Sequence, residues 1–250
     1  MTTEYKSTVQ TTLADRTSTR ARIPWAPAYT QPVEAQGAYQ ARIDRQEAAY
    51  RTEPTQSERA HAAELAYFAP EKRHAEMQRL GLLENYGIDA NHNMESLVVL
   101  HHRHSKHTLV IHRGTSLERS PVQDLMSDAN IVANTFNKGH FGRFQSSLVQ
   151  TKQVMRKYKD RTIENVGHSL GGTTAHYVGM QTGTDSHAFN PGHSWIGTWN
   201  TPDNKGGQHH VYVTDKDWIS EAAKRESSKG AIVHVNQDKV GRPHSIENWY

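Results

Sequence analysis

The chain has 250 residues, of which 35% are hydrophobic and 22% charged, and its formal net charge is +3. This length suits one core-forming domain with an appendage, and the charge excess is too small to argue for nucleic-acid binding. Because cysteine is absent, a disulfide framework and a thiol nucleophile are both excluded. The longest apolar runs are far shorter than a membrane span requires, so we predict no transmembrane segment.

Residues 1–54 are predicted to form an extended or disordered arm that precedes the domain. The segment is rich in threonine, poor in large aliphatic residues and interrupted by prolines. Segments of this kind often become ordered only on binding, so we expect a protein partner for the arm. The first 20 residues lack the apolar stretch of a secretory signal. This leaves the location open and favours a cytoplasmic or virion-associated protein.

Two helices are predicted next. Thr55-Gln56-Ser57-Glu58 fits a capping box, which predicts a helix that runs through about Tyr67. A second helix is expected to begin near Pro70-Glu71 and to end before Gly81, because proline is tolerated in the first turn.

From Met94 the hydrophobic period changes to that of strands. Glu95 to His101 and His107 to Arg113 are predicted to form a hairpin. Farther along the chain, helices are predicted at Phe144 to Tyr158 and Leu170 to Met180, and strands at Thr162 to Val166, Ser186 to Phe189, His209 to Val213 and Ala231 to Val235. This alternation predicts an α/β fold over residues 55–250, with a mostly parallel central sheet and helices on both faces.

The most informative segment is Gly167-His168-Ser169-Leu170-Gly171-Gly172. A strand, a sharp Gly-x-Ser-x-Gly turn and a helix form the nucleophile elbow of α/β-hydrolases. Such a turn strains the backbone of Ser169, and Gly167 and Gly171 leave room for the close approach of neighbouring backbone. The helix that follows directs its N-terminal amides toward an oxyanion formed at the serine.

A serine nucleophile needs a base and an orienting acid, which α/β-hydrolases supply in the chain order serine, acid, histidine. Asp215 and Asp217 both follow the strand that ends near Thr214. Asp217, which precedes Trp218-Ile219-Ser220, is the preferred acid, and Asp215 is the alternative. His244 lies in a loop after the last predicted strand and is the preferred base. His234 is the second candidate, although its place within a strand favours a packing role. His209 and His210 precede the acid and therefore do not fit the order.

The oxyanion hole needs a backbone amide beside that of Leu170. In this fold it comes from a loop after an earlier strand, which predicts Thr115 in Arg113-Gly114-Thr115-Ser116. A separate group contains four histidines: His101, His102, His104 and His107. Histidine is a common ligand of zinc and nickel, so a metal site is one interpretation of this group. No carboxylate or further histidine at ligand spacing completes it, so we favour a solvent-facing hairpin turn and predict no metal and no cofactor.

Together these residues resemble the class 3 lipase family, the α/β-hydrolases that include triacylglycerol lipases of filamentous fungi. The similarity covers roughly residues 60 to 250 and keeps the family's order of motifs. The matching segments are Thr108 to Thr115, Asp124 to Asp128, Gly167 to Gly172, Phe189-Asn190-Pro191-Gly192, Asp217 to Ser220 and His244 to Trp249. The segment Tyr67 to Arg73 is also similar to the helical lead-in of lipase-like proteins of some large DNA viruses.

The resemblance implies an α/β-hydrolase that opens lipid esters at a membrane or droplet surface, as a triacylglycerol lipase or a phospholipase. By the same resemblance Ser169, Asp217 and His244 form the triad, Thr115 and Leu170 line the oxyanion hole, and residues 116–127 form a lid. The chain departs from the family at His112, where an aromatic residue is usual, and in the lid, which lacks the frequent tryptophan.

Two other interpretations stay open at this point. The long N-terminal arm favours a structural or partner-binding protein on a lipase scaffold, for example in a virus particle. The same triad also serves peptidases, thioesterases and acyltransferases, because a fold does not determine the substrate.

Overall fold

The computed structural model describes residues 37–41, 53–114, 140–192, 204–221, 224 and 230–250. The chain divides into two units, Met1–Ile43 and Asp44–Tyr250. Of the first unit, residues 37–41 are described and are helical. Most of the predicted arm lies outside the described residues, so its extended character and the boundary at residue 54 stay predictions.

The second unit is built on a seven-stranded sheet whose strands lie side by side in chain order. The first three strands pair antiparallel: β1 (Tyr86–Met94), β2 (Leu97–His102) and β3 (His107–His112). From β3 onward all pairs are parallel, through β4 (Thr162–His168), β5 (Asp185–Phe189), β6 (His209–Thr214) and β7 (Ile232–Asn236). The predicted hairpin and the mostly parallel sheet are both confirmed.

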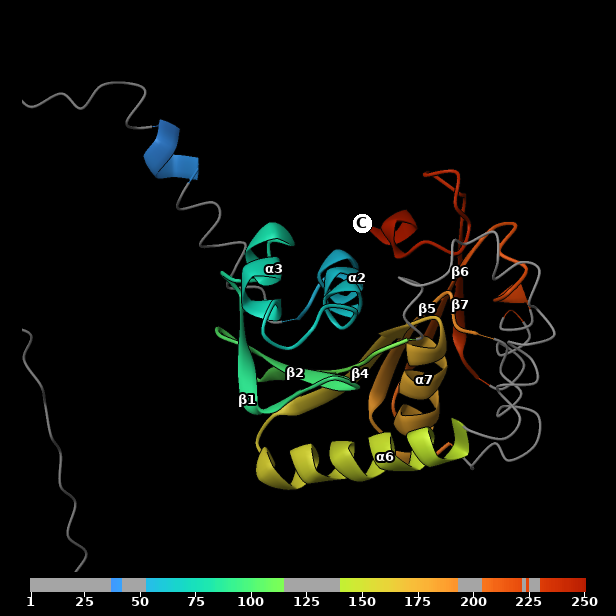
Figure 1. Cartoon of the computed structure of the whole chain (residues 1–250), viewed down its shortest axis with the longest axis horizontal. Coiled ribbons are helices and arrows are strands. Elements are labelled where there is room, and N and C mark those ends of the chain that lie inside the picture. Colours follow the sequence, from blue (N-terminus) through green and yellow to red (C-terminus); the bar gives the residue numbers. More distant parts are fainter. Residues whose placement is uncertain (1–36, 42–52, 115–139, 193–203, 222–223, 225–229) are drawn as a thin grey trace, which may run out of the picture. The chain divides into compact units, whose positions relative to one another are not determined.

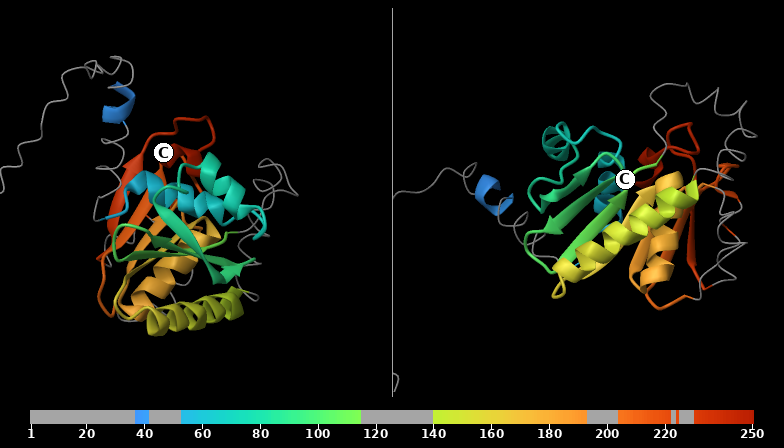
Figure 2. Two further views of the ribbon diagram at one scale, coloured as in Figure 1. Left: turned by 90° about the vertical axis from the view of Figure 1, so that its left-hand side faces the viewer. Right: turned by 60° about the horizontal axis from the view of Figure 1, so that its bottom comes forward.

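Helices cover both faces of this sheet, as predicted (Figures 1 and 2). One face carries α2 (Gln56–Leu65) and α3 (Arg73–Arg79), and the other carries α6 (His140–Lys157) and α7 (Leu170–Thr182). A short 3-10 helix, η2 (Ile246–Trp249), lies against α2. The architecture is an α/β fold with a mostly parallel sheet between two layers of helices (Figure 1). Among the described residues, no helix is long and apolar enough to cross a bilayer.

The predicted capping box opens α2. The Thr55 hydroxyl accepts the Glu58 amide at 3.2 Å, and the Glu58 carboxylate accepts the Thr55 amide at 2.7 Å. The helix ends at Leu65, two residues before the predicted end, and α3 begins at Arg73 rather than near Pro70. Local capping therefore set the start of α2 well, whereas the start of α3 has no side-chain cap to mark it.

Strand β1 is absent from the sequence prediction. Its glycine, aspartate and asparagine residues are poor strand formers, and its register with β2 shifts between Ile88 and Asn93. A long-range contact supports it instead: buried Asp89 accepts the Tyr158 hydroxyl at 2.5 Å. Within the strand, the same carboxylate pairs with His92 Nδ1 at 2.8 Å. The strand forms because the segment at the end of α6 and the neighbouring strand β2 supply its partners, and these contacts cannot be predicted from the residues of β1 alone.

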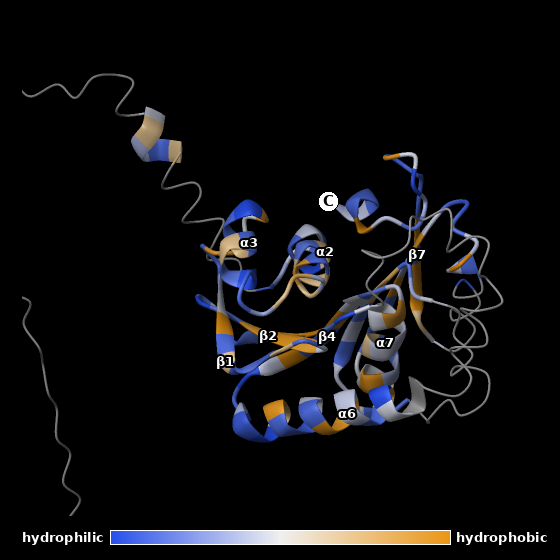
Figure 3. Ribbon diagram, in the orientation of Figure 1, coloured by the Kyte–Doolittle hydropathy of each residue, from blue (hydrophilic) through white to orange (hydrophobic). Residues whose placement is uncertain are grey.

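The apolar residues gather on the central strands and on the helix faces turned toward them (Figure 3). The largest core cluster joins α2, α3 and η2 to the sheet and includes Leu65, Met77, Leu100, Phe189 and Trp249. On the other face, the predicted apolar side of α6 packs against α7 through Phe144, Leu148, Leu170, Tyr177 and Val178. These two layers clamp β4, the strand that leads to Ser169.

Several imidazoles are buried within this core. Burial lowers the pKa of His112, His187 and His209 to about 4, which keeps these rings neutral in the folded protein near pH 7. His112 hydrogen-bonds Asn165 at 2.9 Å, and His209 hydrogen-bonds Ser186 at 2.9 Å. Hydrogen bonds thus compensate part of the cost of burying these rings.

We predict that acid destabilises the fold between about pH 6.5 and pH 4. Each buried ring has a lower pKa in the folded state than in the unfolded chain, so the unfolded chain binds more protons in this window. The contribution of these rings to the free energy of unfolding is therefore fully present above pH 6.5. It is lost as the pH falls toward 4, by about 1 to 3 kcal/mol per ring. Urea unfolding followed by tryptophan fluorescence at several pH values measures this slope. His112→Gln should flatten it, and equal slopes for wild type and variant would contradict the assignment.

Candidate active site

Ser169 occupies a sharp turn between β4 and α7. Its backbone dihedrals are φ 56° and ψ −127°, a region that L-residues rarely adopt. The strand ends at His168 and the helix begins at Leu170, so the serine stands alone between them. Its side chain is partly exposed, whereas both neighbours are buried. The turn therefore presents one hydroxyl to solvent on a rigid support.

The glycines around this turn are required by the close approach of backbone to backbone. A Cβ atom added at Gly167 would lie closer than 3.0 Å to the carbonyl group of Gly171. A Cβ atom at Gly171 would lie equally close to the carbonyl oxygen of His112, at the end of β3. A side chain at either position would push α7 away from the sheet and move Ser169.

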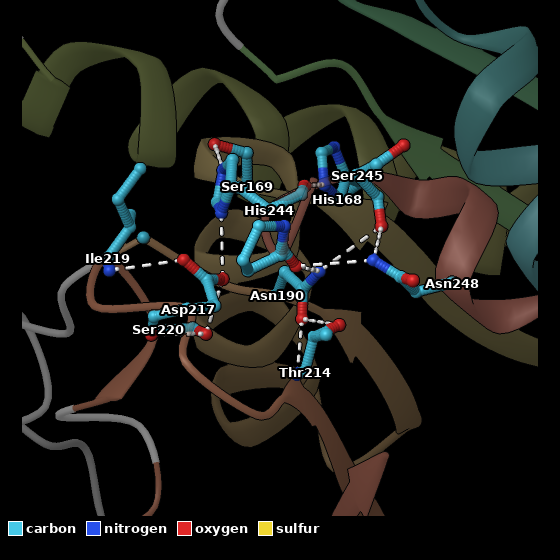
Figure 4. Close-up of polar contacts among 12 residues, drawn as sticks. His168, Ser169, Asn190, Thr214, Asp217, Ile219, Ser220, His244, Ser245 and Asn248 are labelled. Atoms are coloured by element: carbon cyan, nitrogen blue, oxygen red, sulfur yellow. Dashed lines mark hydrogen bonds and ion pairs between the residues drawn. The ribbon is translucent and has the colours of Figure 1, made fainter. Parts of the chain in front are cut away.

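Three predicted side chains lie in contact at this turn (Figure 4). His244 Nε2 lies 2.9 Å from Ser169 Oγ, and His244 Nδ1 lies 2.8 Å from Asp217 Oδ2. A carboxylate only accepts hydrogen bonds, so Nδ1 carries the proton and Nε2 is free to accept the serine hydroxyl. The three side chains form one hydrogen-bonded series, in which the Asp217 carboxylate is buried, the His244 imidazole is half-buried and the Ser169 hydroxyl is accessible.

The carboxylate of Asp217 is held by three donors. Besides His244, the Ser220 hydroxyl donates to Oδ2 at 2.6 Å and the Ile219 amide donates to Oδ1 at 3.1 Å. Burial favours the neutral acid, but the hydrogen bonds and the charge of His244 outweigh it and hold the pKa of Asp217 below its usual value. Asp217 is therefore ionised near neutral pH.

The alternative residues lie elsewhere. Asp215 is exposed, and its amide donates to the carbonyl of Asn236 at 2.6 Å. His234 pairs instead with His210 on the neighbouring strand, with 3.0 Å between His234 Nε2 and His210 Nδ1. The structure thus brings Asp217 and His244 to Ser169 and leaves Asp215 and His234 outside this group.

His168 is a residue whose role the sequence reasoning missed. Its Nε2 lies 2.7 Å from the backbone oxygen of His244, and its Nδ1 lies 2.9 Å from the Tyr67 hydroxyl. Burial and the neighbouring His244 ring lower the pKa of His168 to about 3, so the ring is neutral. Nε2 then donates to His244, and Nδ1 accepts the hydroxyl proton of Tyr67. The motif alone shows a histidine beside the serine but not the carbonyl that it binds.

The loop that carries His244 is held by side chains rather than by a strand ladder. Asn248 donates to the carbonyls of Arg242, Pro243 and Ser245 at 3.0, 3.4 and 3.3 Å. With His168 bound to the His244 carbonyl, the loop's successive carbonyl groups are satisfied by neighbouring side chains (Figure 4). The imidazole is thereby fixed relative to the serine.

The predicted oxyanion loop is described only in part, because Thr115 and the predicted lid, residues 116–127, lie outside the described residues. Gly114 is described, and its amide lies beside the start of α7, since a Cβ atom at Gly171 would lie 2.8 Å from it. The Arg143 guanidinium donates to the carbonyls of Arg113 and Gly114. The chain therefore leaves β3 next to the amide of Leu170, the other predicted oxyanion donor.

The group of four histidines differs from the favoured solvent-facing turn. His104 is exposed as expected, but His102 is buried, and His107 pairs with the buried carboxylate of Glu164 at 2.5 Å. His101 hydrogen-bonds Thr108 at 2.9 Å. The expectation of a solvent-facing turn was wrong because β2 extends to His102 and β3 begins at His107. Side chains alternate between the two faces of a strand, and both faces of this sheet are covered.

Comparisons with known proteins give a family match and several similar structures. A profile of the Uncharacterised protein family (UPF0227) matches residues 121–242, slightly less than half of the chain. This range includes Ser169 and Asp217 and ends two residues before His244. Among curated proteins, no sequence matches significantly.

The similar structures are fungal lipases at low identity. A triacylglycerol lipase from Penicillium expansum is 19% identical with a TM-score of 0.38, over 74% of this chain and 79% of that chain. A lipase from Rhizopus microsporus var. chinensis is 18% identical with a TM-score of 0.44, over 74% of each chain. The Rhizomucor miehei lipase, in its propeptide complex, is 11% identical with a TM-score of 0.41, over 71% and 69%. These are distant resemblances.

We predict that His168→Leu lowers the free energy of unfolding by about 2 to 5 kcal/mol. The change leaves the His244 carbonyl without its donor, which costs about 1 to 3 kcal/mol, and it removes the shorter hydrogen bond of the Tyr67 hydroxyl, worth about 1 kcal/mol. The Tyr67 hydroxyl keeps its longer bond to the His168 carbonyl at 3.3 Å. Urea unfolding at pH 7.5 measures the loss. His74→Leu, at an exposed position of α3, is the matched control and should change stability by less than about 0.5 kcal/mol. Equal effects of the two substitutions would refute the role of His168.

Proposed function

We propose that this protein is a serine ester hydrolase that acts on lipids through an acyl-enzyme intermediate. Ser169 is the proposed nucleophile, His244 the base and Asp217 the orienting acid. The observation that carries the proposal is the unbroken set of contacts from Asp217 through His244 to Ser169, placed on a strained turn at a helix N-terminus. This combination is what acyl transfer by a serine requires.

In the first half-reaction His244 Nε2 takes the proton of Ser169 as Oγ attacks the ester carbonyl. The negative charge that develops on the carbonyl oxygen is held by the amide of Leu170, which starts α7 and has no acceptor within the helix. The amide of Thr115 is the proposed second donor, and each donor contributes about 3 kcal/mol to the transition state. His244 then returns the proton to the leaving alcohol.

Asp217 makes this proton transfer effective. It keeps the proton of the neutral imidazole on Nδ1, so that the lone pair of Nε2 faces the serine. When the imidazole becomes charged, the buried carboxylate stabilises it. In the second half-reaction His244 takes a proton from water, the hydroxide attacks the acyl group, and Ser169 regains its proton as the acid leaves.

The lipid substrate rests on the resemblance of the motifs to class 3 lipases. Support also comes from Trp218, which directly follows Asp217 and is 45% exposed. An exposed indole is apolar with one polar edge, which suits a water–lipid boundary. Both triacylglycerols and phospholipids carry acyl esters that this chemistry opens.

We predict that a fluorophosphonate probe labels the wild-type protein and that Ser169→Ala abolishes the labelling, because the probe bonds to an activated serine oxygen. Release of fatty acid from triglyceride emulsion and from phospholipid vesicles should exceed release from a soluble short-chain ester. The Ser169→Ala variant should release fatty acid from each substrate at least about 10³-fold more slowly than wild type. Wild-type labelling no stronger than that of the variant would rule out Ser169 as nucleophile. A preference for the soluble ester would rule out lipid as the substrate.

The assignment of the acid has its own test. We predict that Asp217→Asn lowers kcat by about 10³- to 10⁴-fold, because an amide stabilises the wrong imidazole tautomer and cannot balance its charge. Asp215→Asn, two residues away and exposed, is the matched control and should retain wild-type kcat. Steady-state hydrolysis of a chromogenic ester measures both. If Asp215→Asn caused the larger loss, the acid would be Asp215.

A further inference from the structure

We infer that Asn190 is a positioning residue that ties the acid side of the candidate site to its base side. The inference rests on the proposed function and adds to it a residue that takes no part in bond making or breaking. Asn190 follows β5 directly, between the turn that carries Ser169 and the strand that leads to Asp217.

The backbone of Asn190 is held in an unusual conformation. Its φ is 38°, in the left-handed region, its side chain is fully buried, and its amide donates to the Tyr212 carbonyl at 2.7 Å. Asparagine visits this region more readily than other side chains, although glycine does so at lower cost. An asparagine at this position therefore points to a need for its side-chain amide.

The oxygen of that side chain faces the strand that precedes the acid. Asn190 Oδ1 accepts the Thr214 amide at 2.8 Å and the Thr214 hydroxyl at 3.1 Å. The carbonyl of Thr214 in turn accepts the Asp217 amide at 3.1 Å. The end of β6, and with it the turn that presents Asp217, is thus held to Asn190.

The nitrogen of the same side chain faces the loop that carries the base. Asn190 Nδ2 donates to the carbonyls of Pro243 and Ser245 at 3.1 and 3.4 Å (Figure 4). These two residues flank His244. One planar amide therefore binds the backbone on both sides of the base and the strand end before the acid, with its donor and acceptor atoms both engaged.

This placement matters because His244 must contact two partners at once. Its loop lacks strand pairing, so its position depends on side chains that hold its carbonyls. Misplacement of a catalytic group by about 1 Å can cost about 10²-fold in rate. Loss of the Asn190 amide would loosen the base relative to the acid without removing a reacting group.

The test uses Asn190→Gly, which suits the positive φ and removes the side-chain amide. We expect kcat for a chromogenic ester and the rate of fluorophosphonate labelling to fall about 10- to 100-fold, while KM changes less than about twofold. Asn91→Gly, at an exposed position of β1, is the matched control and should behave as wild type. Labelling of Asn190→Gly within about twofold of wild type would overturn the inference, as would a rise in KM with kcat unchanged.

A second variant, Asn190→Asp, separates positioning from general stability. It retains an oxygen for Thr214, and only its protonated form has a donor for the carbonyls of Pro243 and Ser245. Once ionised, its carboxylate repels these carbonyls, so we expect kcat to decline on the alkaline side of the pH profile, where wild type stays level. An unchanged profile, or failure of both variants to fold, would overturn the inference. Absence of labelling in the wild type would instead refute the proposed function.

Discussion

At the turn between β4 and α7, peptide groups from three segments lie so close that no Cβ atom fits between them. Gly167 meets Gly171, and Gly171 meets the end of β3 at His112. This close backbone packing forces Ser169 into a strained conformation and directs its hydroxyl out of the fold. It also places the start of α7 beside the loop after β3. The partners of the serine, from β6 and from the C-terminal loop, are arranged around this one rigid point.

The rest of the site depends on side chains that satisfy backbone groups. The loop that carries His244 is not paired with a strand, and its carbonyl groups are bound by the side chains of Asn190, Asn248 and His168. Neutral imidazole suits this task because it offers one donor and one acceptor, which His168 uses toward His244 and Tyr67. His168 is buried and neutral, whereas His244 is less buried and contacts the partly exposed Ser169.

Much of the fold was predictable because its signals are local. The capping box at Thr55, the amphipathic period of α6 and the alternation of helices and strands all follow from neighbouring residues. Strand β1 was not predictable, since its polar residues are stabilised by contacts such as that of Asp89 with Tyr158, 69 positions away. The histidines near residue 102 were misjudged for a related reason: which face of a strand is covered depends on what packs against it.

By itself, the sequence determined the α/β fold class, the turn at Ser169 and the order in which Asp217 and His244 follow it. Glycine spacing and chain order encode these features directly, because each reflects a local steric or topological requirement. Only the tertiary structure decided between Asp217 and Asp215 as the neighbour of His244, and only it revealed the contacts of Asn190 and His168. These contacts join residues 24 to 101 positions apart, and such pairings arise from the packing of the sheet rather than from any pattern along the chain.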